Sequence, residues 1–159
     1  MTMGSKAVER FERAARATGL SFEVLRFPEG TKTAADAARA VGCEVGQIVK
    51  SLVFVAGDEP FLALTSGANQ ADPARLATIL DVAEVRRATA DEARRATGFA
   101  IGGTPPFGHP GALTVLIDGD LMDHHEVWAA AGTPDSVFRL TPDDLLRASR
   151  GRVEDFRRR

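Results

Sequence analysis

The sequence predicts an α+β fold in which helices pack on a mixed, mainly antiparallel sheet with a barrel-like core. Helix-like and strand-like segments follow one another without the regular strand–helix–strand rhythm of a doubly wound parallel sheet. Several strand-like segments are joined by short turn sequences such as Gly57-Asp58-Glu59, which is typical of hairpins. The length fits one domain over residues 1–159, and no repeat or low-complexity linker divides it.

Capping residues predict where the helices begin and end. Thr33 and Thr89 are good N-caps, Asp72 precedes Pro73 at a first helical position, and glycines close several helical stretches. The predicted helices are 4–18 (within an N-terminal segment 1–19), 33–42, 72–80, 89–96 and 141–149. Alternating or continuous apolar stretches predict strands at 21–27 (ending at Pro28-Glu29-Gly30), 48–56, 60–65, 82–86, 113–117, 126–131 and 137–140.

Composition favours a globular chain without a membrane anchor. Hydrophobic residues make up 44% of the chain and charged residues 26%. No apolar run approaches the ~20 residues of a membrane helix, and the N-terminus lacks the apolar core of a signal peptide. The single cysteine, Cys43, excludes an internal disulfide and a cysteine metal cluster. We therefore expect a cytoplasmic protein.

Charge is unevenly distributed along the chain. The net charge of −2 argues against a chain that binds nucleic acid over its whole surface. Arginines nevertheless crowd the C-terminus, including the basic tail at 150–159. This tail is either a segment that contacts phosphates or a solvated, frayed terminus, and the usual behaviour of charge runs favours the frayed terminus.

Lys50 is the first candidate functional residue. It shares one face of the predicted strand 48–56 with Ile48 and Leu52, where a charge is unfavourable unless it meets an anion or a wet cleft. Only three of the 20 basic residues are lysines, so a lysine inside an apolar strand is notable. Lys50 is either a cleft residue that binds a phosphate or carboxylate, or a lysine that snorkels or protects a sheet edge.

The segment 101–111 is the second candidate, because seven of its eleven residues are glycine or proline. Gly102 and Gly103 let the backbone approach a ligand and present N–H groups, while Pro105 and Pro106 stiffen the loop. Such donors suit an oxyanion or a carbonyl. The alternative is a purely structural loop. Neither a P-loop nor a dinucleotide fingerprint is present.

Metal and nucleophile chemistry are not indicated. His124 and His125 would point to opposite faces of a strand, and their spacing does not fit a zinc site. His109 fits a loop anchor better than a proton carrier. No nucleophile-elbow motif is present, and Cys43 follows a helix C-terminus, where the dipole disfavours a thiolate. A hydrolase of this sequence would use activated water or help from its substrate.

Six further patterns run through residues 20–150 in order. They are TAADAA (33–38), QIVKSLVF (47–54), TSG (65–67) with Asp72 and Leu76, GGTPPFG (102–108), VLID (115–118) and LTPDDL (140–145). Each pattern is weak alone, but their order and spacing together are specific. In this order the chain resembles the YbaK/EbsC family, the free-standing relatives of the editing domain inserted in bacterial prolyl-tRNA synthetases.

The resemblance implies deacylation of mischarged tRNA, typically a tRNA for proline that carries a smaller or similar amino acid. Lys50 matches the family's key lysine, expected near the terminal adenosine and its phosphate. Gly102–Pro106 matches the family's Gly-x-x-x-Pro loop, whose backbone holds the aminoacyl carbonyl, so Gly102 and Gly103 join Lys50 as expected catalytic residues. The implied substrate-binding residues are Thr33, Ser51, Ser66, Gly67, Thr104, Pro105, Pro106, Phe107, Ala130 and Gly132.

The resemblance also implies how the reaction proceeds and with what. Water hydrolyses the ester without metal, cofactor or covalent intermediate, and in some members the ribose 2′-hydroxyl or a thiol of the substrate assists. The implied partner is the 3′ aminoacyl-adenosine end of a mischarged tRNA, with a prolyl-tRNA synthetase as a second candidate partner.

One position departs from the family pattern. Alanine-specific members carry a histidine in the strand that closes the amino-acid pocket, whereas this chain has Ala130 there. The roomier pocket argues against alanyl-tRNA and leaves cysteine, serine, threonine or small non-protein amino acids open. Two other functions also stay open: a non-catalytic module that binds aminoacyl-tRNA or a synthetase, and a hydrolase of small-molecule esters.

Overall fold

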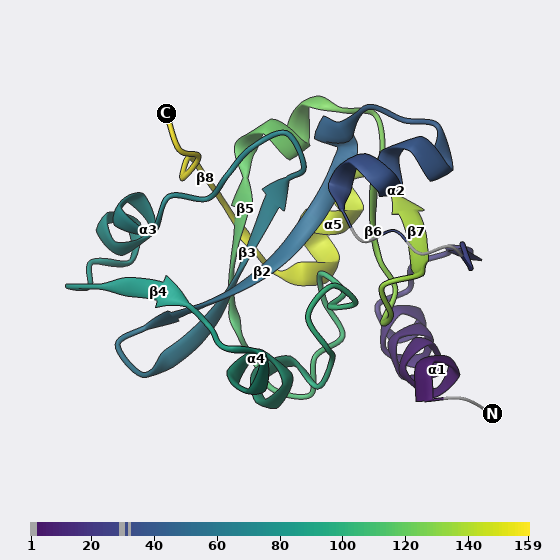
Figure 1. Cartoon of the computed structure of the whole chain (residues 1–159), viewed down its shortest axis with the longest axis horizontal. Coiled ribbons are helices and arrows are strands. Elements are labelled where there is room, and N and C mark those ends of the chain that lie inside the picture. Colours follow the sequence, from purple (N-terminus) through teal and green to yellow (C-terminus); the bar gives the residue numbers. More distant parts are fainter. Residues whose placement is uncertain (1–2, 29–30, 32) are drawn as a thin grey trace.

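Strand β2 (Ile48–Ala56) is the central strand of a mixed sheet and has the bounds that the sequence predicts. The computed structural model describes residues 3–28, 31 and 33–159 and confirms the α+β class (Figure 1). The strand order is β1-β7-β6-β2-β3-β5-β8, with β4 also beside β2. The other strands are β1 (Val24–Arg26), β3 (Glu59–Ser66), β4 (Val85–Arg87), β5 (Thr114–Asp118), β6 (Val127–Ala130), β7 (Ser136–Leu140) and β8 (Arg152–Glu154).

The sheet combines both strand directions. Pairs β1–β7, β2–β3, β2–β4 and β6–β7 are antiparallel, and pairs β2–β6, β3–β5 and β5–β8 are parallel. The hairpin predicted at Gly57-Asp58-Glu59 joins β2 to β3. The first strand is shorter than predicted, because β7 pairs with it at only three positions. Of the break predicted at Pro28-Glu29-Gly30, residues 29 and 30 lie outside the described residues.

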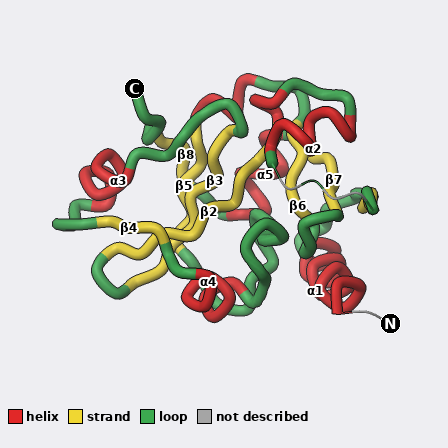
Figure 2. Tube along the Cα trace, viewed as in Figure 1, coloured by secondary structure: helices red, strands yellow, loops and turns green. Residues whose placement is uncertain are grey.

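Five helices surround the sheet in the described part of the chain (Figure 2). They are α1 (Met3–Ala17), α2 (Ala34–Val41), α3 (Pro73–Leu80), α4 (Ala90–Thr97) and α5 (Pro142–Ser149), and two short 3₁₀ turns are η1 (Val45–Gln47) and η2 (Gly119–Asp123). The predicted caps are confirmed: the Thr33 hydroxyl accepts a hydrogen bond from the Asp36 N–H at 3.0 Å, and Thr89 forms a capping box with Glu92. None of these helices is long and apolar enough to cross a membrane.

An aromatic cluster attaches α1 and the 101–111 loop to the sheet. The ring of Phe11 lies 4.7 Å from that of Phe138 and 5.5 Å from that of Phe107, measured between centroids. All three side chains are buried. Tilted aromatic pairs at such distances stabilise beyond their burial alone. The glycine–proline loop is therefore anchored to the core through Phe107.

The sheet divides at the middle of β2, and this division positions the site. On the edge of β2 opposite β3, residues Ile48 and Val49 pair with β6, whereas Phe54 to Ala56 pair with β4. The Val53 carbonyl accepts from the N–H of Ala88, which directly follows β4. Residues 50–52 lie between the two ladders, so neither neighbouring strand covers this stretch of the edge. β4 and β6 lie beside opposite ends of β2 (Figure 1).

The C-terminal segment is folded, and the frayed terminus favoured by the sequence is wrong. Strand β8 pairs in parallel with β5, and the fully buried Phe156 packs in a cluster with Phe54 and Leu116. The sequence does not predict that this segment folds, because one aromatic residue among many charged residues gives no periodic pattern. Burial of Phe156 stabilises a segment whose charges alone would leave it in solvent.

This packing predicts that Phe156→Ala lowers the free energy of unfolding by about 3–5 kcal/mol, the usual result of truncating a fully buried phenylalanine. Val153→Ala is the matched control from the same segment, because Val153 is 40% exposed and its truncation should change stability by less than about 0.5 kcal/mol. Urea unfolding of the two variants measures the difference. Equal stabilities would contradict an anchored C-terminus.

Candidate active site

A pocket of about 550 Å³ opens where the sheet divides. Its wall combines the middle of β2 with α2, the start of the glycine–proline loop, β6 and the end of β4. The volume lies in the range of ligand-binding pockets. Of the predicted site residues, the structure brings together Thr33, Lys50, Ser51, Gly67, Gly102, Thr104 and Ala130.

Lys50 contributes a positive charge to this pocket. Its ammonium Nζ donates a hydrogen bond to the main-chain oxygen of Asn69 at 2.6 Å, which uses one of its three N–H donors. Burial lowers the pKa of Lys50, and the nearby Arg87 lowers it further, whereas Asp118 acts in the opposite direction. Among the described residues no carboxylate forms an ion pair with Lys50. The remaining donors can therefore bind an anionic group.

Ser51 presents polar groups on the uncovered edge of β2. The Ile48 carbonyl accepts from the Gly67 N–H on the β3 side, and backbone groups alternate between the two edges along an antiparallel strand. The N–H and C=O of Ser51 therefore face the side away from β3, where the pocket opens. Its hydroxyl is buried and has no hydrogen-bond partner within the described part of the chain. An unsatisfied buried hydroxyl costs about 1–3 kcal/mol, and the groups of Ser51 that stay open to a ligand are those of its backbone.

The glycine–proline loop contributes less to the pocket than the sequence predicts. Gly102, at a φ of +89°, lines it, and so does Thr104, whose hydroxyl donates to the Ala100 carbonyl at 3.1 Å. Gly103 is buried outside the lining, and its N–H donates to the same Ala100 carbonyl at 3.0 Å. A Cβ on Gly103 would lie 2.7 Å from the Cα of Thr133, so glycine is needed here for close packing. A role of the Gly103 N–H in holding substrate is therefore not supported.

The following loop residues support the pocket from behind. Pro105, Pro106 and Phe107 are buried but lie outside the lining. The Pro105 carbonyl forms a 2.8 Å hydrogen bond with Nε2 of His109, as expected if His109 anchors the loop. These residues hold the shape of the loop and do not form the wall of the pocket.

Two other predicted binding residues also lie behind the wall of the pocket. Ser66 is buried, and its hydroxyl donates to the Gly46 carbonyl at 2.8 Å. Gly132 has a φ of +119°, and a Cβ there would lie 2.8 Å from the Ala7 carbonyl oxygen, so its role is to allow contact with α1. Gly67 does line the pocket, and a side chain there would collide with the Val45 carbonyl oxygen.

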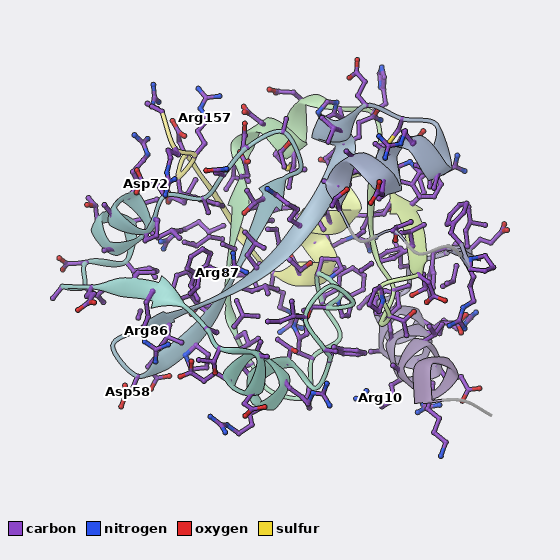
Figure 3. All side chains as sticks on the ribbon, in the orientation of Figure 1. Arg10, Asp58, Asp72, Arg86, Arg87 and Arg157 are labelled. Atoms are coloured by element: carbon purple, nitrogen blue, oxygen red, sulfur yellow. The ribbon has the colours of Figure 1, made fainter. Side chains whose placement is uncertain are left out.

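Arg87 and Ile101 both line the pocket, although the sequence did not predict either of them as a site residue. Arg87 ends β4 (Figure 3). Its guanidinium lies 5.4 Å from the centre of the Phe54 ring. Ile101 is 50% exposed, which is unusual for so apolar a residue. Ile101 could have been predicted as a pocket residue from its position next to Gly102. Arg87 is one of many arginines, so nothing in the sequence distinguishes it.

The other chemistry-bearing residues do not assemble into a site. No group of three or more His, Cys, Asp or Glu residues in the described ranges could hold a metal ion. His124 follows η2 and is not in a strand, because β6 begins only at Val127. Burial, together with Glu126 and Glu44, raises the pKa of the Cys43 thiol, which disfavours the thiolate that a nucleophile needs.

Fold and pocket together define a small α+β domain that presents a half-buried cation and an uncovered strand edge to a ligand. Residues 28–148 match the model of the aminoacyl-tRNA editing domain, and the chain belongs to this family. The resemblance found in the sequence is thereby confirmed. A solved structure of a proposed trans-editing enzyme for prolyl tRNA synthetase is 44% identical, has a TM-score of 0.91 and covers 96% of this chain and 98% of its own.

Curated relatives include both free-standing and larger proteins. The uncharacterized protein YwhH of Bacillus subtilis is 30% identical over 132 residues, which are 82% of this chain and 83% of YwhH. The proline–tRNA ligase of Lactobacillus johnsonii is 35% identical over 93 residues, which are 58% of this chain but only 16% of the ligase. The chain thus spans a small part of the ligases that it matches.

His109 generates a prediction for pH. Burial lowers the pKa of His109 in the folded chain, although the hydrogen bond to Pro105 opposes this shift. The unfolded chain then binds more protons in the window below the ordinary histidine pKa of about 6.5, so stability falls as the pH drops from 7 toward 5. His109→Gln should reduce that fall, as measured by urea unfolding at each pH. His125→Gln is the matched control, because His125 is exposed; an equal effect of both variants would contradict the prediction.

Proposed function

We propose that this chain hydrolyses the ester of a mischarged tRNA in trans, with a tRNA for proline as the substrate. The half-buried Lys50, which no carboxylate pairs within the described residues, is the observation that carries the proposal, because a pocket cation suits the phosphate of a terminal adenosine. Membership of the editing-domain family and the matches to proline–tRNA ligases support the choice of substrate. Such a substrate implies action in the cytoplasm.

Substrate binding uses groups on several sides of the pocket. Lys50 and Arg87 provide positive charge for a phosphate of the 3′ end. The half-exposed Ile101 offers an apolar surface for the terminal adenine. The backbone N–H and C=O of Ser51 bind the ribose or the aminoacyl group, since they face the open edge of β2. The Thr33 hydroxyl already caps α2, so its contribution to binding is mainly the shape of the wall.

Hydrolysis then proceeds by attack of water on the ester carbonyl carbon. A new carbon–oxygen bond forms, and the bond to the ribose oxygen breaks, which releases the free amino acid and a tRNA whose ribose hydroxyl has taken up a proton. The Gly102 N–H is the loop donor proposed to stabilise the oxyanion, because Gly103 uses its own N–H within the loop. The described lining holds no activated serine or cysteine, so the substrate's 2′-hydroxyl or thiol is the proposed helper.

Lys50→Ala should abolish deacylation while leaving the chain folded, because the substrate loses its principal cationic contact. The assay measures release of amino acid from a panel of mischarged tRNAs, with circular dichroism to confirm folding. Lys6→Ala is the matched control, because Lys6 is exposed on α1 and lies outside the pocket. Equal rates for Lys50→Ala and the wild type would exclude this role of Lys50. Saturable binding of mischarged tRNA without turnover would instead indicate a binding module, and equal cleavage of free aminoacyl esters a general esterase.

Ala130 is proposed to determine which amino acid fits. It lines the pocket from β6 and is only partly buried, so a larger side chain there would occupy space in the cavity. Ala130→Val should lower kcat/KM for tRNA carrying threonine relative to tRNA carrying alanine by at least about 10-fold, because one methylene group in a pocket is worth about 10- to 200-fold and valine adds two carbon atoms. Ala129→Val is an unsuitable control because Ala129 is buried in the core. Ala68→Val serves better, because Ala68 is exposed and outside the lining; a selectivity unchanged by Ala130→Val would exclude this assignment.

A further inference from the structure

A chain of polar contacts leads from Lys50 to the C-terminal segment. The Lys50 ammonium donates to the main-chain oxygen of Asn69 at 2.6 Å. The side-chain amide of Asn69 in turn donates to two carboxylates, Asp118 and Asp120, each at 2.8 Å. Asn69 is therefore held from its side chain while its carbonyl faces the lysine.

The two carboxylates are themselves fixed. Asp118 is 2% exposed and accepts the N–H groups of Ser66 and Asp120 at 3.0 Å. A buried carboxylate is stable only with such donors, so its position is well determined. Asp120 accepts from Arg157 at 2.9 Å, and this ion pair brings the C-terminal segment into the network.

The C-terminal backbone also pairs with the loop that carries Asn69. The Asp72 N–H donates to the Phe156 carbonyl at 2.8 Å, and the Arg158 N–H donates to the Gln70 carbonyl at 2.7 Å. Arg157 and Asp72 lie at the same corner of the molecule (Figure 3). Because Phe156 is fully buried, this pairing has a rigid anchor.

We propose that Asn69, Asp120 and Arg157 are positioning residues that hold the Asn69 carbonyl against the ammonium of Lys50, so that the C-terminal segment sets the orientation of this lysine. The importance of that orientation for catalysis rests on the function proposed above. A lysine has a long, flexible side chain, and one fixed acceptor restricts it while leaving two N–H donors for substrate. The acceptor is a neutral carbonyl, so the charge of Lys50 stays available to an anion. Asp118 and Arg87 are the charged groups that act on Lys50 from the neighbouring elements.

The first test observes Lys50 directly by NMR with ¹³C-labelled lysine, which is feasible because the chain has only three lysines. Arg157→Ala and Asn69→Ala should each shift the ε-methylene resonance of Lys50 and its titration midpoint. Arg157→Lys, which keeps the charge, should restore much of the wild-type signal. Arg159→Ala is the matched control, because Arg159 pairs with Asp155 and forms no hydrogen bond or ion pair with Asn69 or Asp120 among the described residues. Unchanged Lys50 signals in both Arg157→Ala and Asn69→Ala would overturn the proposal.

The second test measures deacylation of mischarged tRNA by the same variants. Arg157→Ala should lower kcat/KM by about 10- to 100-fold, as expected for a displaced catalytic group, with Arg157→Lys intermediate and Arg159→Ala at the wild-type rate. Asp120→Asn keeps the shape of the side chain and weakens its pair with Arg157, so it should also lower kcat/KM. This variant tests the proposal if Arg157→Ala does not fold. Wild-type rates in Asp120→Asn and Arg157→Ala would contradict the positioning role. A wild-type chain that deacylates no mischarged tRNA would overturn the proposed function instead, and the NMR comparison would still decide the position of Lys50.

Discussion

The division of the sheet along one edge of β2 is the constraint on which the site depends. A strand in the middle of a sheet normally has both edges hydrogen-bonded, which leaves its backbone no polar group for a ligand. Here the partner changes from β6 to β4 along the same edge, and the stretch between them stays uncovered. The pocket therefore lies deep in the sheet yet is lined by main-chain and side-chain polar groups.

The same division explains why Lys50 and Ser51 can be neighbours with different surroundings. Successive side chains of a strand point to opposite faces, so Lys50 reaches Asn69 while Ser51 turns its hydroxyl into the interior. The exposed edge of β2 lies between them. One dipeptide thus supplies a charge and backbone polar groups to a single pocket, and Gly102 of the loop lines the same pocket.

Local signals in the sequence predicted much of the fold. Caps such as Thr33 and Asp72 mark helix starts because they act within a few residues, and β2 is readable as one apolar strand. Lys50 was identifiable as an interruption of that strand and does line the pocket. What could not be predicted depends on contacts between distant segments: the close approach of Gly103 to Thr133, the burial of the Ser51 hydroxyl without a partner, and the ladder between β8 and β5.

The segment that holds Asn69 has a further consequence for how this family can diverge. Residues 28–148 match the family, whereas Phe156 and Arg157 lie beyond that match. The pocket and the element that bears on its lysine are thus encoded in separate stretches of the gene. Substitutions within residues 150–159 can change the orientation of Lys50 without altering a residue that lines the pocket. Variants of this chain with identical pockets can in this way differ in rate, and comparison of their pocket residues alone would not reveal it.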